Sequence, residues 1–413
     1  MEVATVAGNQ LLNGGIDGIG TLARFREPRG IVYASGKGLF VADSGSSAIR
    51  KIDSASRTVT TIISTGMATP MALCYHEPSE SMFVMDDHLA DSAKKFIKSV
   101  DLTTMSVSTL YALYPSSLTA SQTLSGYPIS KTCGLRDGKF WVCVMFGTSR
   151  GVISSAAENR FPSCAADSSS ATPLIYILRM YGATSLNDIW RWSPGANITH
   201  MYGSQGLVAP FLISGLASAI AYYNYTLVVC DYANNRIVRL SLPSFQFSVA
   251  YGSPNNTFGY KDGYGTNALF NAPVGIGVTQ GGSYFLGDLG NSRLRTINRT
   301  DGKVSSLIGN GNAVSMDGLG QAAGFATSTS WSMAIDENGT FFVSESGLIG
   351  SSSGSVIRQV SCVPCMQVRR YNRRLCYLTG LLSKPTANLF KLQGYFCPSL
   401  DAFYDCPIGR ACC

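Results

Sequence analysis

Acidic residues recur at matching places along this chain, and a ring of carboxylates is one way to hold a calcium ion. Asp43, Asp86, Asp231 and Asp288 each end a strand-like run. Calcium takes about six to eight oxygen ligands, often from carboxylates. A residue that repeats in unit after unit is nevertheless more often structural, because a carboxylate at a turn accepts backbone N–H bonds. We expect these aspartates to stabilise turns, with calcium ringed in a channel as the alternative.

Three Asp-Gly pairs raise the same question, at residues 17–18, 262–263 and 317–318. A calcium loop needs a run of alternating acidic residues, which none of the three has. A turn with glycine at positive φ accounts for them better. Arginine also recurs, in the third strand of each unit. We expect it to brace the framework by pairing with carboxylates or carbonyls of the neighbouring unit; the residues concerned are Arg50, Arg239, Arg295 and Arg358.

Histidine is scarce, and its three copies do not converge. His76, His88 and His200 fall at different positions of different units, which speaks against a three-His zinc centre. His88, beside Asp86 and Asp87, is the only local cluster. The sequence has no phosphate loop and no converging Ser/His/Asp set. We predict no catalytic residue, no metal site and no cofactor.

The elements that position these residues belong to a repeat of roughly 40–55 residues. Residues 17–63 and 262–308 are its clearest copies. Each reads DG-x-G, a small residue before Phe, Pro, and then three strands joined by turns, and an outer strand completes four. Weaker copies lie at 68–87 with 96–110, at 228–242, and at 317–346, and one is split between 133–147 and 187–203. Six such sheets, packed radially, bury faces that one sheet alone cannot.

DGIGTLARF, FVADSGSSAIRKID and VTTI, with their second copies DGYGTNALF and GDLGNSRLRTIN, resemble the NHL-repeat family over about 360 residues. The resemblance implies four-stranded blades that close into a propeller, commonly of six, and proteins of this family commonly bind macromolecules. We predict an all-β fold: a six-bladed β-propeller over residues 1–360, followed by a disulfide-rich module over residues 361–413. A non-repeating layered β protein is the alternative fold.

The sixth unit supplies only three strands, SMAID, TFFVSES and SVIRQV, before Cys362. VATVAG at residues 3–8 has the pattern of the missing outer strand. We predict that it pairs with the last blade and closes the ring, which also covers open strand edges. An insertion over about residues 148–186 in the third blade is either functional or a loop that covers a blade edge.

Cysteines are concentrated at the end of the chain, where seven of the twelve lie after Ser361. CVPC could be half a zinc site, but the segment has no histidine, so a disulfide-stapled module is favoured. Cys133 and Cys143 align with positions that lie nearly opposite one another on the adjacent strands of a hairpin. Two interpretations are open, a disulfide bridge across the strands or two buried thiols. Cys74 and Cys230 are expected to be small core residues. The tail candidates for disulfides are Cys362, Cys365, Cys376, Cys397, Cys406, Cys412 and Cys413. Seven is odd, so one must pair with the propeller, pair with another chain, or stay free.

Charge argues against nucleic-acid binding. The net charge is +7, of which the segment from Ser361 onward carries +5, leaving +2 for the large domain. The basic cluster is a candidate interaction site or a solvated face: Arg369, Arg370, Arg373 and Arg374. No run of about eighteen apolar residues predicts a membrane span, and no signal-peptide pattern is visible before the first strand.

Five N-x-S/T sequons are candidate glycosylation sites: Asn197, Asn224, Asn255, Asn298 and Asn338. With the clustered cysteines they favour an extracellular or cell-surface glycoprotein. We expect a non-enzymatic scaffold that binds other proteins, and one form of this expectation is binding to copies of itself, as in a surface filament, appendage or matrix. The alternative function is a propeller enzyme of lyase or lactonase type, with a metal in its channel. RNA binding, known for some NHL proteins, is disfavoured by the nearly neutral large domain.

Overall fold

In the computed structural model of this chain, the first repeat folds into one antiparallel sheet, and its sequence explains how. Residues 28–34 form the first strand, and Gly36 and Gly38 turn the chain with φ of 67° and 109°. The next strand, Gly38–Asp43, is buried almost throughout because neighbouring blades cover both of its faces. A 3-10 turn with Ser47 in the left-handed region (φ 52°) then leads to the third strand. Asn235 and Ser292 take the same backbone conformation in two other blades.

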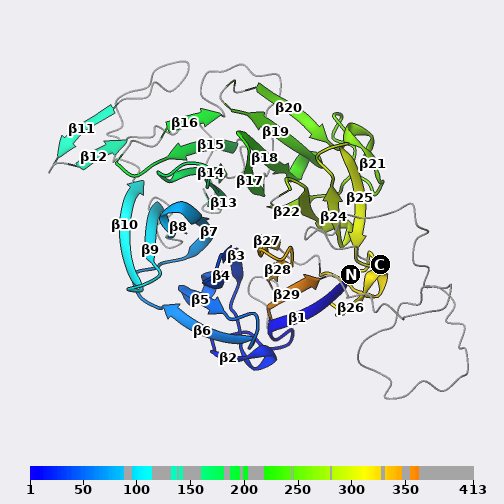
Figure 1. The fold of residues 1–413 in the computed structure, drawn as a ribbon, viewed down its shortest axis with the longest axis horizontal. Coiled ribbons are helices and arrows are strands. Elements are labelled where there is room, and N and C mark those ends of the chain that lie inside the picture. Colours follow the sequence, from blue (N-terminus) through cyan, green and yellow to red (C-terminus); the bar gives the residue numbers. More distant parts are fainter. Residues whose placement is uncertain are drawn as a thin grey trace, which may run out of the picture.

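Six such sheets form a ring, so the chain is an all-β six-bladed propeller (Figure 1). The structure describes residues 1–87, 95–113, 132–136, 139–142, 160–180, 187–195, 199–202, 218–242, 244, 246–279, 281–326, 331–346 and 354–361. Within these residues the only helical segments are short 3-10 turns, and none is long and apolar enough to cross a membrane.

In each blade the strands lie side by side, from the innermost strand at the channel to the outermost strand at the rim. Blade 1 contains β3 (Pro28–Ala34), β4 (Gly38–Asp43), β5 (Ala48–Ile52), β6 (Thr58–Ile63) and β2 (Gly18–Ile19). Blade 2 contains β7 (Pro70–His76), β8 (Ser81–Asp87), β9 (Lys95–Asp101) and β10 (Ser106–Leu113). Blade 3 contains β16 (Thr199–Tyr202), β15 (Asn187–Trp192), β14 (Leu174–Met180) and, innermost, β13 (Arg160–Asp167). Blade 4 contains β17 (Ala219–Tyr223), β18 (Thr226–Asp231), β19 (Arg236–Ser241) and β20 (Gln246–Tyr251).

The last two blades have five strands each, like blade 1. Blade 5 contains β22 (Pro273–Val278), β23 (Tyr284–Asp288), β24 (Arg293–Ile297), β25 (Lys303–Ile308) and β21 (Gly263–Tyr264). Blade 6 contains β27 (Trp331–Ile335), β28 (Phe341–Glu345), β29 (Val356–Ser361), β1 (Glu2–Gly8) and β26 (Gly318–Leu319). The 3-10 turns are η1 (Gly20–Leu22), η2 (Ser44–Ser46), η3 (Glu77–Ser79), η4 (Tyr232–Asn234), η5 (Gly265–Asn267), η6 (Leu289–Asn291) and η7 (Gly320–Ala322).

The N-terminal strand closes the ring as predicted. β1 pairs antiparallel with β29, placing Val3 opposite Val360 and Thr5 opposite Arg358. Its apolar side chains are buried, Val6 completely. The Thr5 N–H also donates to Asp317 Oδ2 at 2.9 Å, which ties the first residues of the chain to the loop that precedes blade 6.

The hydrophobic core lies between blades, in six clusters that each join one blade to the next. The cluster between blades 6 and 1 contains Val6, Ile31 and Phe342, so the closing strand belongs to the core. The Phe that follows a small residue in the repeat is fully buried in blades 1, 5 and 6: Phe25, Phe270 and Phe325. Because each blade buries its faces only against its neighbours, the ring stabilises all six together.

The predicted insertion at residues 148–186 is wrong. Residues 160–167 and 174–180 are the two inner strands of blade 3, β13 and β14, paired in register with β15. The apolar run in β14 explains this, since Ile175, Ile177 and Leu178 are fully buried and suit a central strand. β11 (Thr132–Arg136) and β12 (Lys139–Val142), predicted to open blade 3, form a separate two-stranded sheet.

Candidate functional site

The inner strands of all six blades enclose a central cavity of about 460 Å³. Each of β3, β7, β13, β17, β22 and β27 contributes to its lining, and consecutive inner strands lie side by side around the axis. Glycine allows this approach, because a Cβ at Gly30 would lie 2.8 Å from the backbone of Ala72. At Gly275 (φ +49°) a Cβ would lie 2.6 Å from the carbonyl oxygen of Trp331.

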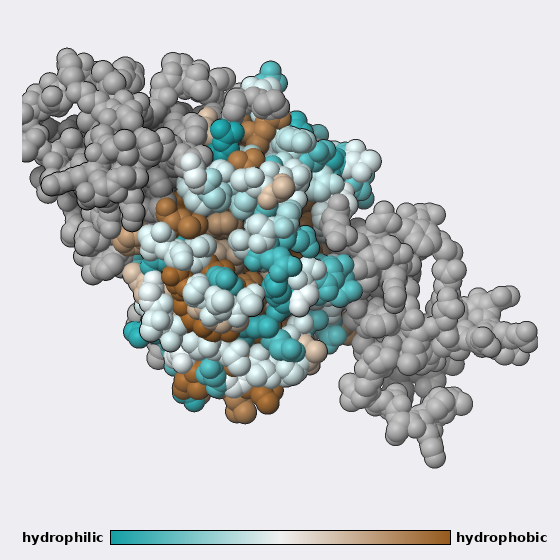
Figure 2. Space-filling view, turned by 60° about the vertical axis from the view of Figure 1, so that its left-hand side comes forward, coloured by the Kyte–Doolittle hydropathy of each residue, from teal (hydrophilic) through white to brown (hydrophobic). Residues whose placement is uncertain are grey.

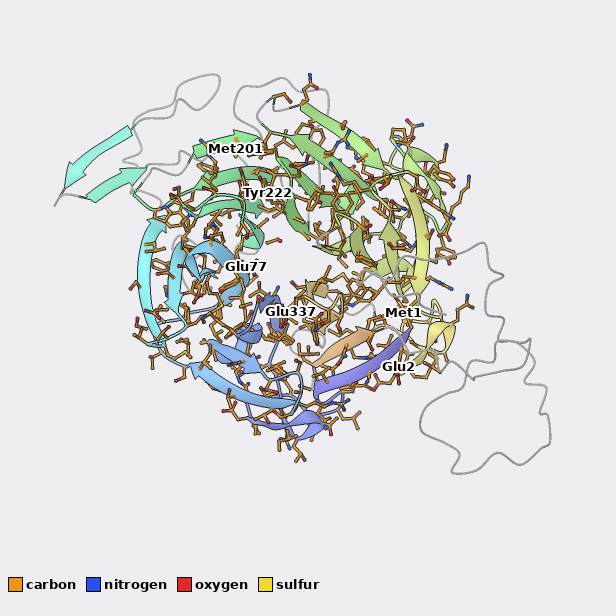
Figure 3. All side chains as sticks on the ribbon, viewed as in Figure 1. Met1, Glu2, Glu77, Met201, Tyr222 and Glu337 are labelled. Carbon is orange, nitrogen blue, oxygen red and sulfur yellow. A yellow bond between two sulfur atoms is a disulfide. The ribbon has the colours of Figure 1, made fainter. Side chains whose placement is uncertain are left out.

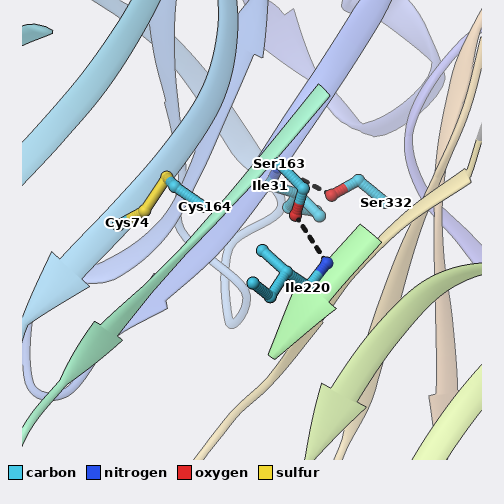
Figure 4. Close-up of a disulfide and its surroundings, with 6 residues drawn as sticks. All are labelled: Ile31, Cys74, Ser163, Cys164, Ile220 and Ser332. Carbon is cyan, nitrogen blue, oxygen red and sulfur yellow. Dashed lines mark hydrogen bonds between the residues drawn. A yellow bond between two sulfur atoms is a disulfide. The ribbon is translucent and has the colours of Figure 1, made fainter. Parts of the chain in front are cut away.

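Small and apolar side chains dominate the cavity wall, which includes Ile31, Ala72, Ala165, Ile220 and Met333. Serine side chains of the wall join neighbouring blades by accepting backbone hydrogen bonds. The Ile220 N–H donates to Ser163 Oγ (3.2 Å), and the Ile31 N–H donates to Ser332 Oγ (3.4 Å) (Figure 4). Such a wall can bind an apolar group, but it brings no acid, base and nucleophile together.

One end of the channel is acidic. Glu77 of η3, with Asp336 and Glu337 of the β27–β28 turn, lines a further cavity of about 240 Å³, and we call these three residues the acidic mouth. Figure 3 shows Glu77 and Glu337 close to the axis of the ring. Glu337 accepts a hydrogen bond from Ser35 Oγ (3.1 Å). Burial and a hydrogen bond to Glu337 raise the pKa of Tyr33 to about 12, so Tyr33 is a neutral donor at this mouth.

The repeated strand-end carboxylates do not reach the channel as ligands. Asp43 is fully buried; it accepts the Arg26 N–H at 2.7 Å and pairs with Arg50 at 2.9 Å. Arg50 in turn pairs with Asp17 of the first Asp-Gly pair at 2.6 Å. Asp17 also accepts the Thr61 N–H from the outer strand, so one guanidinium links the second, third and outer strands of its blade.

Blades 5 and 6 repeat this network with one change. Arg295 joins Asp288 (2.6 Å) to Asp262 (2.8 Å). In blade 6, Arg358 joins Asp317 (2.8 Å) to a glutamate, Glu345 (3.0 Å). All three arginines are fully buried. The expected turn-stabilising role is confirmed for Asp43, Asp86 and Asp288, which accept backbone N–H groups, whereas Asp231 accepts from the side chains of Asn234 and Arg236. The Asp-Gly aspartates hold arginine.

Burial raises the pKa of the Asp43 carboxyl to about 6, although the Arg26 N–H and the Arg50 cation act in the opposite direction. Asp231 shows the same balance and also has a pKa of about 6. For Asp17, which is half exposed, hydrogen bonds from Thr61 and the Arg50 cation outweigh the effect of burial and lower the pKa.

Three details of the framework prediction are wrong. Arg239 is exposed, and Val238 opposite Val229 holds the position that Arg50 has opposite Val41. Blade 4 uses Arg236 instead, which pairs with Asp231 at 2.8 Å. The arginines also pair within their own blade and not with a neighbour. Finally, positive φ falls on the second glycine of each DG-x-G, at Gly20 (57°), Gly265 (54°) and Gly320 (52°).

In blade 2 a lysine takes the place of the buried arginine, and the sequence patterns did not predict it. Lys98 lies opposite Val84, the position of Arg50 in blade 1, and its ammonium reaches Asp86 at 2.5 Å. Asp86 also accepts the Ala68 and Thr69 N–H groups. A basic residue three positions before the end of the third strand was the available signal. The Asp86 carboxylate is thereby occupied, which removes the main ligand of the proposed calcium ring in this blade.

Histidine does not form a metal centre in the described part of the chain. His76 is buried; its Nδ1 lies 2.7 Å from Ser79 Oγ and its Nε2 lies 2.8 Å from the Ser170 carbonyl oxygen of blade 3. His88 and the side chain of His200 lie outside the described residues. Among the residues that are described, no group of three or more His, Cys, Asp or Glu could hold a metal ion.

A disulfide joins two inner strands, and it corrects the expectation for Cys74. Cys74 of β7 bonds to Cys164 of β13, with Cα atoms 5.9 Å apart, so blades 2 and 3 are linked covalently (Figure 4). The misplaced insertion concealed this pair, because it removed β13 from the ring. Cys230 is a buried free thiol, as predicted. The matching of Cys133 and Cys143 to a hairpin of blade 3 is wrong, and Cys143 lies outside the described residues, as do all seven tail cysteines and the basic cluster at residues 369–374.

No known family model matches this chain, and no curated protein matches it. Solved structures share its architecture. A Bacteroides thetaiotaomicron VPI-5482 protein of unknown function aligns with a TM-score of 0.62 and 16% identity, covering 87% of this chain and 75% of that one. An auxiliary nutrient binding protein from the same organism aligns at 0.54 with 14% identity, covering 87% and 76%.

A calcium-binding protein, regucalcin from Agrobacterium tumefaciens str. C58, aligns at 0.50 with 12% identity and covers 81% of this chain and 90% of that one. What these proteins share is the propeller fold. At such low identities the likeness concerns architecture alone. The assignment to NHL repeats stays a prediction.

Proposed function

We propose that this chain is an extracellular interaction scaffold: a rigid propeller that presents its faces, edges and tail to other proteins. One observation carries the proposal: the repeated charged side chains pair with one another inside the blades. Asp43, Asp288 and Glu345 are buried and bound to arginines within their blades. The channel wall consists mainly of small and apolar side chains, with Arg29 and several serines and tyrosines among them. The repeated charged side chains thus serve to hold each blade together.

Two observations support an oxidising compartment. The Cys74–Cys164 bridge spans 90 residues of sequence and joins neighbouring blades, and bridges of this kind persist mainly in secreted or cell-surface proteins. The sequon residues Asn224, Asn298 and Asn338 lie exposed in hairpin turns, and Asn255 lies exposed in the loop before blade 5. An oligosaccharide can be attached only to asparagines that are accessible in this way. Asn197 lies outside the described residues.

A finer form of the proposal is self-assembly into a surface filament or matrix through the tail. Among the described side chains of the propeller, Cys74 and Cys164 form a bridge and Cys230 is buried, so a bond to a second chain would come from Cys133, Cys143 or the cysteines beyond Ser361. A head-to-tail contact of this type produces fibres unless its geometry closes. Neither nucleic acid nor a membrane span enters this proposal.

The test separates the scaffold from the channel-metal enzyme. Protein secreted from eukaryotic cells is analysed by mass spectrometry with and without reduction and glycosidase, and its metal content is measured after dialysis against a chelator. We expect N-glycans, no stoichiometric metal, and no turnover of lactones or of amidated-peptide precursors. The variant Asn338→Gln should lose one glycan mass, whereas Asn312→Gln, at an exposed asparagine outside any sequon, should lose none. Stoichiometric zinc or calcium together with turnover would replace the scaffold by the enzyme.

A further inference from the structure

The exposed apolar side chains of the described chain are concentrated on one part of the rim. Of the thirteen large hydrophobic residues that are exposed, ten lie in three loops, at residues 9–24, 253–269 and 309–324. We call these ten the apolar belt: Leu11, Leu12, Ile16, Ile19, Leu22, Phe258, Tyr260, Tyr264, Val314 and Met316. Leu11 is 81% exposed and Leu22 is 74% exposed. Single exposed hydrophobic residues are normal, but such a concentration marks a contact surface.

The three loops are equivalent parts of the repeat, and they cover consecutive blades. Each adds a two-residue strand to the outer edge of its blade, with Ile19 opposite Thr58 in blade 1 and Tyr264 opposite Lys303 in blade 5. Blade 6, between these two, has its own short strand, β26. Gln10 Nε2 donates to Ser315 Oγ at 3.2 Å and joins the loop of blade 1 to that of blade 6. Figure 2 shows hydrophobic surface at the lower edge of the molecule, the side on which β2 lies in Figure 1.

Covering the apolar belt would remove few unpaired charged side chains from water. Its acidic residues Asp17, Asp262 and Asp317 are already paired with the buried arginines. The remaining charged side chains of the three loops are Arg24 and Lys261. An occupant can therefore exclude water from this surface without a large desolvation penalty.

The position of the chain end identifies the occupant. β29 ends at Ser361 opposite Glu2, and Glu2 lies opposite Leu319 of β26. The tail therefore leaves the propeller at blade 6, in the middle of the belt. Residues 362–413 are rich in apolar side chains, as in LCYLTGLL and LFKLQGYF, yet a segment of this size has too few residues to build a large core alone. Because it is tethered at this point, its effective concentration at the belt is high, in the millimolar range for short linkers.

We propose that the Cys-rich tail, residues 362–413, docks in cis on the apolar belt and covers the rim of blades 5, 6 and 1. The belt supplies the apolar surface that the tail lacks, and the tail shields the belt from other molecules. This inference is independent of the scaffold proposal, since an enzyme could carry the same docked tail.

The first experiment uses trypsin on the full-length protein. The belt variant combines Ile19→Glu, Leu22→Glu and Tyr264→Glu, which add no trypsin site, and its matched control combines Met105→Glu, Leu110→Glu and Tyr225→Glu at exposed apolar positions outside the belt. After digestion and reduction, peptides from the basic cluster at residues 369–374 are quantified over time. We expect cleavage there at least tenfold faster in the belt variant, with the control at the wild-type rate and both melting temperatures near that of the wild type. Equal cleavage rates in the two variants would overturn the proposal.

The second experiment distinguishes cis docking from docking onto a second copy. A photo-crosslinking amino acid replaces Leu22, or Tyr225 as control, in full-length protein mixed from light and heavy isotope preparations. We expect crosslinks from position 22 to tail peptides of the same isotope, and none from position 225. Crosslinks from position 22 that join light to heavy chains would overturn cis docking in favour of exchange between subunits. A belt without tail crosslinks would overturn it altogether.

Discussion

Replacing Arg50 by alanine tests whether the buried guanidinium holds blade 1 together. Arg50 is fully buried and donates to Asp43 Oδ2 (2.9 Å), to Asp17 Oδ1 (2.6 Å) and to the Arg24 carbonyl oxygen (3.2 Å). Asp17 is half exposed, so water can replace its lost partner at little cost. Asp43 is fully buried and keeps the Arg26 N–H and the Ser46 side chain as its hydrogen-bond donors. Removing one partner of a buried pair typically costs about 3–5 kcal/mol.

The assay is urea unfolding followed by circular dichroism and tryptophan fluorescence. At an m-value of about 3 kcal/mol/M, the expected loss moves the Arg50→Ala midpoint down by about 1 M or more. The control is Arg239→Ala, an exposed arginine in the third strand of blade 4, whose effect should stay within about 0.5 kcal/mol. A midpoint for Arg50→Ala equal to that of Arg239→Ala would refute the framework reasoning.

The pH dependence of the same variant separates charge from packing. In the wild-type protein the Arg50 cation lowers the pKa of Asp43, which burial has raised to about 6. Without that cation the folded-state pKa rises further above the unfolded value of about 3.9. The folded variant then binds more protons than its unfolded state, so its stability relative to wild type falls as pH rises. We expect a larger deficit at pH 8 than at pH 5; a deficit independent of pH would mean lost packing alone.

Two further predictions concern closure and the covalent link. Val6→Ala should lower the free energy of unfolding by about 2 kcal/mol, because it removes two fully buried methyl groups. Leu11→Ala, at an exposed position, should change little, and equal midpoints would show that β1 does not close the ring in solution. Reduction, or Cys74→Ser, should cost about 2–4 kcal/mol. Adding Cys164→Ser to Cys74→Ser should cost little more, and a wild-type midpoint unchanged by reductant would contradict the bridge.

Much of the fold could be predicted because the repeat is strongest where backbone geometry demands specific residues. DG-x-G needs a glycine at positive φ, at Gly20 and Gly265, and the following small residue and Phe are fully buried. These constraints act within one blade and are visible in its sequence. The closing strand was predictable by counting, since a blade that lacks its outer strand leaves an open edge.

Blade 3 was not predictable in the same way, because two segments have strand-like hairpins and only one of them is in the ring. Residues 132–142 contain a plausible hairpin, and they do pair as β11 and β12. The choice between this hairpin and β13–β14 depends on contacts with blades 2 and 4. Cys164 must face Cys74, and Ser163 must reach Ile220. Contacts between blades are not encoded by spacing within a unit, so the pattern of one blade cannot reveal them.

The predictions for the charged residues were correct for local interactions and wrong for non-local ones. Asp43, Asp86 and Asp288 were correctly expected to accept backbone N–H bonds, a local interaction that depends on turn chemistry. The partner of each buried arginine was assigned to the wrong blade, because Asp17 is 33 residues from Arg50 and meets it only through the outer loop. Arg239 was expected to be a framework residue, but the framework position in blade 4 is one residue earlier, at Val238. Neighbouring residues of a strand face opposite sides of the sheet, so a difference of one residue places Arg239 on the other face.

The two halves of the ring are held by different means, and this difference predicts where the propeller opens first. Blades 5, 6 and 1 each have a buried arginine between two acids and an outer loop that adds a fifth strand. In the part of the chain that the structure describes, blades 2, 3 and 4 have four-stranded sheets, and blades 2 and 3 are joined by the disulfide. The covalent link reinforces the side of the ring on which the described residues supply no fifth strand. When the bond is reduced, hydrogen exchange should therefore rise first in β7 and β13, while β3 and β22 stay protected. Uniform exchange around the ring after reduction would mean that the six blades open as one cooperative unit, with no weaker side for the bridge to reinforce.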